Sequence, residues 1–255
     1  MEILMRVFLL DVSINFVGWC ISAAAKTHKN YDLVGSISYL LCTAVSLFHS
    51  ERNLVQKVQS LLIIVWALRL GIYLFSRALK RGDARMKKYD DKPILFLIPF
   101  FLQILWVFIM SSPTYLLNRT SSPELIFSVY FGWTIWGIGF LIEALADHQK
   151  SVFLDDEANA GKFIKTGLWS ITRHPNYFGE IMLWTGLFIS AAGSFTSFIE
   201  YLSIFSIAFI YLLLRYVSGI PLLEKNGEKR WGHQPDYQKY CSTVPILTPF
   251  ISIYK

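Results

Sequence analysis

The chain has 255 residues, of which 54% are hydrophobic and 16% are charged. Soluble domains contain about 25% charged residues, so this composition argues against a water-soluble globule. It also excludes a disordered chain, which needs low hydrophobicity and a high net charge. The 24 Lys and Arg residues outnumber the 18 Asp and Glu residues, which gives a net charge of +6. In a membrane protein such an excess is typical of cytoplasmic loops rather than of a nucleic-acid surface, so no nucleic-acid partner is expected.

Seven apolar runs follow one another along the chain, most of them close to the 20 or so residues with which a helix crosses a bilayer. The sequence therefore predicts an all-α fold, a polytopic membrane helix bundle with about seven transmembrane helices. The first run lacks a basic leader and a small-residue cleavage site, so it is interpreted as a retained helix. The sixth is short, and a tight hairpin at 193–194 joins it to the seventh. The runs cover residues 3–25, 33–49, 58–79, 93–111, 124–147, 177–192 and 198–220.

The distribution of Lys and Arg predicts the orientation of these helices. With the N-terminus outside or lumenal, most Lys and Arg residues fall on the cytosolic side, and the opposite side holds Arg6, Arg52, Lys57 and Arg119. The positive-inside rule therefore places the C-terminus, the loop 148–176 and the tail 221–255 in the cytosol. The tail is expected to fold back over the cytosolic ends of the helices. The glycosylation sequon that begins at Asn118 falls on the lumenal side.

Polar residues gather where the predicted helices reach the cytosol. The chain has no glycine-rich nucleotide loop, no His-Glu-x-x-His and no cluster of its five histidines, so no metal site is expected. Glu143 and Asp147 share one face at the predicted end of the fifth helix. This face is either a solvated helix end or a surface that hydrogen-bonds a polar cofactor.

The residues from Arg173 to Glu180 form the densest group of polar side chains. Pro175 suits the first turn of a helix, which leaves Arg173 and His174 just ahead of its N-terminus. Free backbone N–H groups, the helix dipole and an arginine together make an anion site. The alternative is an interfacial cap in which Tyr177 is an anchor and Arg173 neutralises Glu180.

The segment from Gly167 to Gly186, GLWSITRHPNYFGEIMLWTG, resembles the steroid 5α-reductase-like family of membrane proteins, and most closely its branch of uncharacterised function. The resemblance extends to LRLGIYLFSRALKRGDAR, EALADHQK, SGIPLLE and the tail from Tyr237 to Pro245. It implies an NADPH-dependent membrane oxidoreductase with seven helices. Such enzymes reduce a C=C bond conjugated to a carbonyl in a steroid, sterol or other lipid-like substrate, with the hydride delivered from the cytosolic side.

The resemblance also implies that a single membrane domain, 1–255, has one part that binds the substrate and another that binds the cofactor. Residues 1–115 would hold the lipophilic substrate, and residues 124–255 would bind NADPH. The positions carried over as cofactor contacts are Asp147, Asn159, Arg173, His174, Asn176, Tyr177 and Glu180. Catalytic residues are not identified, because the family's Glu/Tyr pair for the substrate carbonyl has no counterpart among Asp11, Asn15, Tyr31 and Asp32. An arginine of the steroid-active members is also missing, since Phe153 and Leu154 occupy its region.

Two alternatives stay open. Membrane methyltransferases of the isoprenylcysteine or phospholipid type also use an Arg-His-Pro-x-Tyr helix start, in their case to bind S-adenosylmethionine. A non-enzymatic lipid-binding membrane protein is the third possibility. In each case the helices are embedded in membrane lipid. The membrane is expected to be the endoplasmic reticulum in a eukaryote and the inner membrane in a bacterium.

Overall fold

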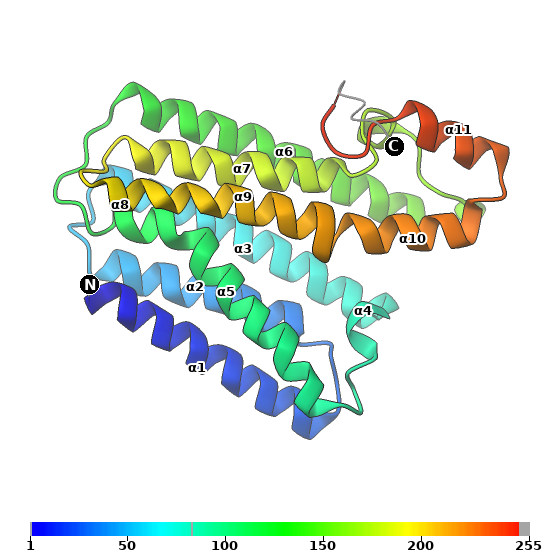
Figure 1. Ribbon diagram of the computed structural model, residues 1–255, viewed down its shortest axis with the longest axis horizontal. Helices are drawn as coiled ribbons and strands as arrows, with labels where there is room; N and C mark the ends of the chain where they lie inside the picture. The colour runs from blue at the N-terminus through cyan, green and yellow to red at the C-terminus, as the bar shows by residue number, and fades with distance from the viewer. Residues whose placement is uncertain (1, 83, 250–255) are drawn as a thin grey trace. The chain divides into compact units, whose positions relative to one another are not determined.

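The computed structural model describes residues 2–82 and 84–249, and these residues form helices and no strand (Figure 1). Six helical segments are long and apolar enough to cross a membrane: Glu2–Ala25, Tyr31–Phe48, Leu54–Lys80, Pro93–Leu117, Phe127–Asp155 and Phe198–Trp231. The prediction of an all-α polytopic membrane bundle is therefore confirmed, and the chain is an integral membrane protein by these criteria. Which membrane holds it, and in which orientation, stays a prediction.

The helices begin close to the predicted apolar runs, and the fourth run, 93–111, continues as helix to Leu117. In chain order the α-helices are α1 (Glu2–Ala25), α2 (Tyr31–Phe48), α3 (Leu54–Arg81), α4 (Ala84–Lys87), α5 (Pro93–Leu117), α6 (Phe127–Asp155), α7 (Pro175–Ala192), α8 (Phe198–Tyr201), α9 (Phe205–Leu212), α10 (Ile220–Trp231) and α11 (Pro235–Thr243). Three short 3-10 helices, η1 (Glu157–Asn159), η2 (Gly167–Ser170) and η3 (Leu202–Ile204), and the π-helix η4 (Leu213–Val217) lie between them. The sixth predicted run, 177–192, is helical as α7, although α7 is not among the six apolar segments.

The predicted end of the fifth helix was wrong. Helix α6 continues past Asp147 to Asp155, so Asp147 lies about two turns inside the helix. Residues 148–155 contain neither Gly nor Pro, and nothing in their backbone chemistry ends a helix. The segment predicted as the loop 148–176 consequently starts as helix, and the loop proper begins after Asp155.

The chain forms two compact units. Unit 1 combines the residues up to Tyr130 with Phe188–Ser206, and unit 2 combines Phe131–Leu187 with the residues from Ile207 onward. In unit 1, buried polar side chains link three helices. Asn15 on α1 donates to the Ser38 hydroxyl on α2 (3.0 Å), and Gln103 on α5 donates to the Asn15 side chain (2.8 Å). Each bond satisfies groups that would be costly to leave unpaired in an apolar interior.

Asn118, the residue of the glycosylation sequon, is part of the interior of unit 1. Its side-chain amide donates to the hydroxyls of Ser46 (3.1 Å) and Ser60 (3.2 Å), and only 4% of the residue is exposed. The folded chain therefore presents no accessible acceptor at this sequon, whichever side of the membrane it faces.

In unit 2, helices α6 and α7 run side by side because two glycines face each other (Figure 1). A Cβ atom at Gly179 would lie 2.6 Å from the Gly139 carbonyl oxygen and 2.7 Å from the Glu143 amide nitrogen. Real Cβ atoms do not approach backbone so closely, so only glycine permits this spacing. The loop after α6 is attached to the same helix, since Trp169 donates its indole N–H to the Ala146 carbonyl (3.1 Å).

A π-helix and a glycine bring α10 close to the start of α7. In η4 the backbone hydrogen bonds join residues five apart instead of four, as in a π-helix. The Ser218 amide, for example, donates to the Leu213 carbonyl (2.9 Å). Gly219 follows, and a Cβ there would lie 2.8 Å from the Leu214 carbonyl oxygen and 3.0 Å from the Tyr177 ring. The chain can thus pass directly against Tyr177 before α10 begins, which places Glu224 of α10 near the residues that precede α7.

Candidate functional site

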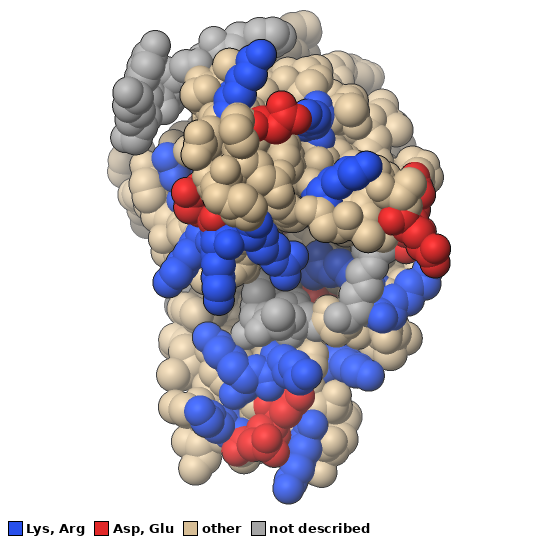
Figure 2. All heavy atoms as spheres, turned by 90° about the vertical axis from the view of Figure 1, so that its right-hand side faces the viewer, with Lys and Arg blue, Asp and Glu red and all other residues tan. Residues whose placement is uncertain are grey.

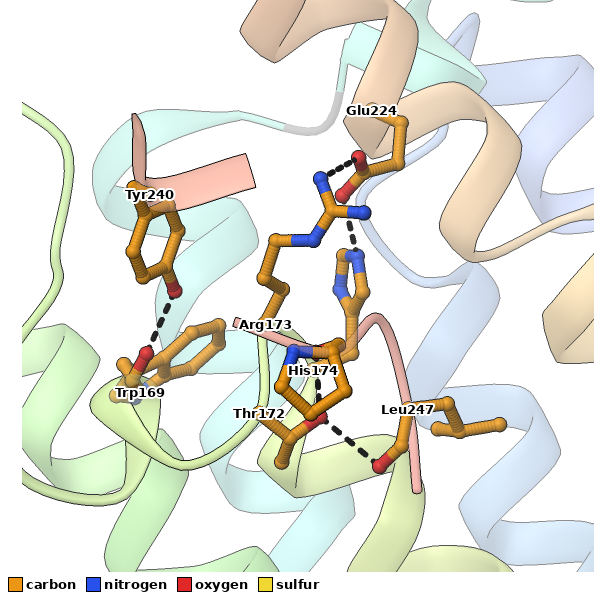
Figure 3. Close-up of polar contacts among 8 residues, drawn as sticks. Trp169, Thr172, Arg173, His174, Glu224, Tyr240 and Leu247 are labelled. Carbon is orange, nitrogen blue, oxygen red and sulfur yellow. Dashed lines mark hydrogen bonds and ion pairs between the residues drawn. The ribbon is translucent and has the colours of Figure 1, made fainter. Parts of the chain in front are cut away.

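Arg173 and His174, just ahead of α7, converge on one carboxylate of α10 (Figure 3). Nη1 of Arg173 donates to Oε2 of Glu224 at 2.5 Å, and Nε2 of His174 lies 2.8 Å from Oε1. The His174 side chain is only 5% exposed, whereas the Glu224 side chain is 29% exposed. One carboxylate therefore fixes a guanidinium and an imidazole at the edge of the interior, with charge-assisted bonds to both of its oxygens.

The C-terminal tail folds over these residues, as the sequence led us to expect. The Pro245 carbonyl accepts from the Arg173 amide (2.9 Å), and the Leu247 carbonyl accepts from the Thr172 hydroxyl (2.9 Å). Farther back on α11, Tyr240 donates its hydroxyl to the Trp169 carbonyl at 2.6 Å (Figure 3). Backbone and side-chain bonds thus hold the segment 169–173 from the tail side.

Most of the predicted cofactor contacts come together in unit 2. The Asn176 side-chain amide donates to the Asp147 carboxylate (3.2 Å), and the Tyr177 ring stacks on the His174 ring at a centroid distance of 5.6 Å. Glu180 is buried on α7. Pro175 is the first residue of α7, as predicted. The cap interpretation expected Arg173 to neutralise Glu180, but the carboxylate that Arg173 contacts is Glu224.

Asn159 is not part of this group. It belongs to the loop after α6, where its amide donates to the Phe153 carbonyl and to the Asp156 carboxylate, both at 3.2 Å. It lines an open hollow of about 640 Å³, together with Asp155 at the end of α6 and with Asp156 and Glu157 of the same loop. Among residues 2–82 and 84–249, no three or more His, Cys, Asp or Glu side chains are placed to hold a metal ion.

Arg173, His174 and Glu224 line a cavity of about 270 Å³ that lies wholly within unit 2. Of the described residues that line it, four are basic and one is acidic, so its wall carries an excess of positive charge. Aromatic rings form much of the rest. The basic residues are Lys150, Lys162, Arg173 and Arg230, the acidic residue is Glu224, and the rings are those of Phe153, Phe163, Trp169, Trp231, Tyr237 and Tyr240.

Basic side chains also lie on α10 of unit 2, which lines part of the cavity. Figure 2 views the right-hand side of Figure 1 and shows several groups of Lys and Arg side chains there. On α10, Lys229 and Arg230 occupy the last turn. These charges of unit 2 give an anion a favourable approach to the cavity.

Burial lowers the pKa of His174, and the nearby charges of Lys150 and Arg173 act in the same direction against the opposing effect of Glu224. The ring is therefore neutral at pH 7, and Nε2 donates its proton to the Glu224 carboxylate. The other ring nitrogen, Nδ1, then carries a lone pair. Nδ1 of His174 and Nε of Arg173 are buried and have no hydrogen-bond partner among the described residues.

The sequence alone did not identify Glu224 as part of the site. It lies 50 residues after His174 along the chain, and only the packing of α10 against the start of α7 joins the two. The segment SGIPLLE, which contains Glu224, belonged to the resemblance, but no spacing rule connects it to Arg173.

Comparisons with known proteins assign the chain to a family and leave its chemistry open. The model of a family described as "Protein of unknown function (DUF1295)" matches residues 18–244. A protein of Ustilaginoidea virens described as "Probable O-methyltransferase ustE" is 27% identical over 104 residues, which is 41% of this chain and 34% of that protein. The matched part thus spans about a third of that relative's length. No solved structure matches the chain.

Proposed function

We propose that this chain, which belongs to the DUF1295 family, is a membrane-embedded reductase that binds NADPH in the cavity of unit 2. Its substrate would be a lipophilic molecule with a C=C bond next to a carbonyl. One observation carries the proposal, namely the wall of the cavity, where four basic side chains face one carboxylate among aromatic rings. Phosphate groups suit the basic side chains, and a base or nicotinamide ring suits the aromatic faces.

The residues present fit part of such a cofactor. Small-molecule sites usually have about 300–1,000 Å³, and a cavity of about 270 Å³ accommodates a base with its ribose rather than a whole dinucleotide. Lys150, Lys162 and Arg230 would neutralise phosphate groups. The two buried atoms without partners, on Arg173 and His174, offer a donor and an acceptor. Orphaned buried groups of this kind call for a ligand or a water molecule.

The cofactor, when bound, would supply a hydride, and the protein would supply binding, orientation and charge. Asn176 and the Asp147 carboxylate that it contacts do not line the cavity, so they would hold amide or hydroxyl groups of the part of the cofactor that extends beyond it. The tail that covers 169–173 would limit the access of water. Unit 1 would hold the lipophilic substrate, as the resemblance implies. In support, a small cavity of about 70 Å³ there is lined mainly by apolar and aromatic residues, together with Asp32, Ser36 and Gln103.

A second candidate is methyl transfer from S-adenosylmethionine, which the relative described as a probable O-methyltransferase favours. The two cofactors differ in charge near the reacting atom. S-adenosylmethionine carries a sulfonium cation and no phosphate, so a wall with four basic residues suits it less than it suits NADPH. We therefore place the reductase first.

Thermal unfolding of the detergent-purified protein with NADPH, NADH or S-adenosylmethionine tests the proposal. A ligand at 100 times its Kd stabilises the folded state by about 2.7 kcal/mol, so NADPH should raise the melting temperature clearly and NADH less. Stabilisation by S-adenosylmethionine alone would favour the methyltransferase. No response to any of the three would favour a non-enzymatic lipid-binding protein.

Variants then test the site. Arg173→Ala should weaken NADPH binding by roughly 10–150-fold, because charge-assisted hydrogen bonds contribute about 1.5–3 kcal/mol. Lys229→Gln is the matched control. Lys229 is exposed in the last turn of α10 in the same unit and does not line the cavity. It should therefore leave the affinity unchanged, and equal losses in both variants would contradict the assignment of the site.

A further inference from the structure

His174 presents two ring nitrogens to very different surroundings. Nε2 lies 2.8 Å from Oε1 of Glu224, whereas Nδ1 is buried and has no hydrogen-bond partner among the described residues. The residue is only 4% exposed, and it lines the cavity of unit 2. A buried acceptor without a donor is unfavourable, so the arrangement is complete only when a donor reaches Nδ1.

Glu224 determines which nitrogen of His174 carries the proton. Its other oxygen, Oε2, accepts from Arg173 at 2.5 Å. The bond to a guanidinium keeps the carboxylate ionised, and an ionised carboxylate has only acceptor atoms. Nε2 of a neutral His174 must therefore be the N–H, which leaves the lone pair on Nδ1. A further acceptor is thereby built into a cavity whose wall also holds four cationic donors.

We propose that Glu224 is a positioning residue that fixes the His174 tautomer, so that Nδ1 of His174 accepts a hydrogen bond from the amino group of an adenine ring. The inference rests on the proposed function, in that it assigns part of the same nucleotide site. It concerns the adenine, which NADPH and S-adenosylmethionine share, and not the reacting group in which they differ.

The chemistry of the site favours an amino group over the other groups of a nucleotide. Phosphate and carbonyl oxygens carry lone pairs and are repelled by the lone pair on Nδ1. A hydroxyl can donate or accept, so it would not need a fixed tautomer. An exocyclic amino group conjugated to a purine only donates, and the aromatic rings of Phe163, Trp169 and Tyr240 provide faces on which the purine can lie.

The test compares NADPH with its analogue in which hypoxanthine replaces adenine. In this analogue an oxygen acceptor replaces the amino group. The parent protein should bind NADPH about tenfold more tightly than the analogue, as expected for one buried hydrogen bond. Affinities are measured by titration of the detergent-purified full chain, so the readout does not depend on turnover.

Three variants test whether the preference for NADPH over the analogue depends on Nδ1 of His174 and on Glu224. In His174→Gln the amide nitrogen can replace Nε2 and still donate to Glu224, but no acceptor remains at Nδ1, so the preference should fall to about one. In Glu224→Gln no carboxylate determines which ring nitrogen of His174 carries the proton, so the preference for NADPH over the analogue should also fall. Asp236→Asn, the control, removes the charge of an exposed α11 residue that pairs with Lys165 outside the cavity, and it should keep the preference intact.

The outcomes separate this inference from the proposed function. If the parent binds NADPH and the analogue equally, or if the preference survives His174→Gln, the inference is overturned while NADPH binding stands. If the parent binds S-adenosylmethionine instead of NADPH, the reductase proposal fails, and the same comparison is made with the hypoxanthine analogue of that cofactor. If it binds neither nucleotide, both proposals fail.

Discussion

Gly179→Ala should destabilise the protein, because the new methyl group has no space between α6 and α7. Its Cβ would lie 2.6 Å from the Gly139 carbonyl oxygen and 2.7 Å from the Glu143 amide nitrogen. Both are backbone atoms, which cannot rotate away as a flexible side chain can. Overpacking of this kind costs about 1–3 kcal/mol, and the rigid neighbours place the cost near the upper end. The higher helix propensity of alanine offsets about 1 kcal/mol of this cost. The free energy of unfolding should therefore fall by about 2 kcal/mol.

Gly137→Ala on α6 is the matched control. A Cβ there has no atom within 4 Å apart from its own helix and chain neighbours, so the variant should gain about 1 kcal/mol from helix propensity alone. The two variants should therefore differ by about 3 kcal/mol in the free energy of unfolding. At about 2–4 °C per kcal/mol for a chain of this size, their melting temperatures should differ by roughly 6–12 °C.

Thermal unfolding in detergent measures this difference, and nucleotide titration measures its consequence for the site. Gly179 lies one turn after Asn176, whose side chain contacts Asp147 across the same two helices at 3.2 Å. A forced separation of α6 and α7 should lengthen this contact and weaken nucleotide binding in Gly179→Ala only. Equal melting temperatures for the two variants would refute the close approach of the helices on which the geometry of the site depends.

Three further predictions follow from the packing and from the charge distribution. Asn118 should carry no glycan, so Asn118→Gln should leave the electrophoretic mobility of protein from a glycosylating host unchanged; a faster band would show that the sequon is used. Because burial lowers the pKa of His174 below its unfolded value of about 6.5, the unfolded chain binds more protons as the pH falls through this range. Acidification from pH 7.5 to 5.5 should then lower the melting temperature more in the parent than in His174→Gln. An equal decrease in the two proteins would mean that protonation of His174 does not cause the loss of stability. Cysteines introduced at the exposed positions Thr196 and Lys229, with Cys241 replaced by serine, should react with impermeant thiol reagents from opposite sides of the membrane. Labelling of both from one side would contradict the predicted orientation.

The sequence predicted the helices well, because the bilayer imposes a strong condition on composition. A span needs about 20 apolar residues, and such runs are visible without any knowledge of packing. The end of α6 was missed for the same reason. Its last two turns, 148–155, are more polar than a span and leave the apolar pattern, yet their backbone remains helical to Asp155. Hydropathy marks where a segment stops being apolar, and not where its helix ends.

The candidate site was predictable only in its local part. Pro175 at the first turn of a helix, with Arg173 and His174 just ahead of it, follows from backbone chemistry that can be read along the chain. The contact of both residues with Glu224 depends on η4 and on Gly219, which allow α10 to approach Tyr177 closely. A π-helix has no reliable sequence signature, so the direction in which the chain enters α10 was not visible in the residues themselves.

The contact with Glu224 also changes how a mutation at Arg173 should be interpreted. One of the two interpretations of the sequence was an anion site with the arginine charge available to a ligand, but in the structure Glu224 balances much of that charge at 2.5 Å. Arg173→Ala would therefore remove a cation and also leave a partly buried carboxylate without its guanidinium, and that carboxylate would repel an anionic ligand. The double variant Arg173→Ala/Glu224→Gln separates the two effects. If it recovers much of the nucleotide affinity lost in Arg173→Ala, Arg173 acts mainly by neutralising Glu224, and Lys150, Lys162 and Arg230 are the principal phosphate contacts. If it recovers none, Arg173 binds the ligand directly.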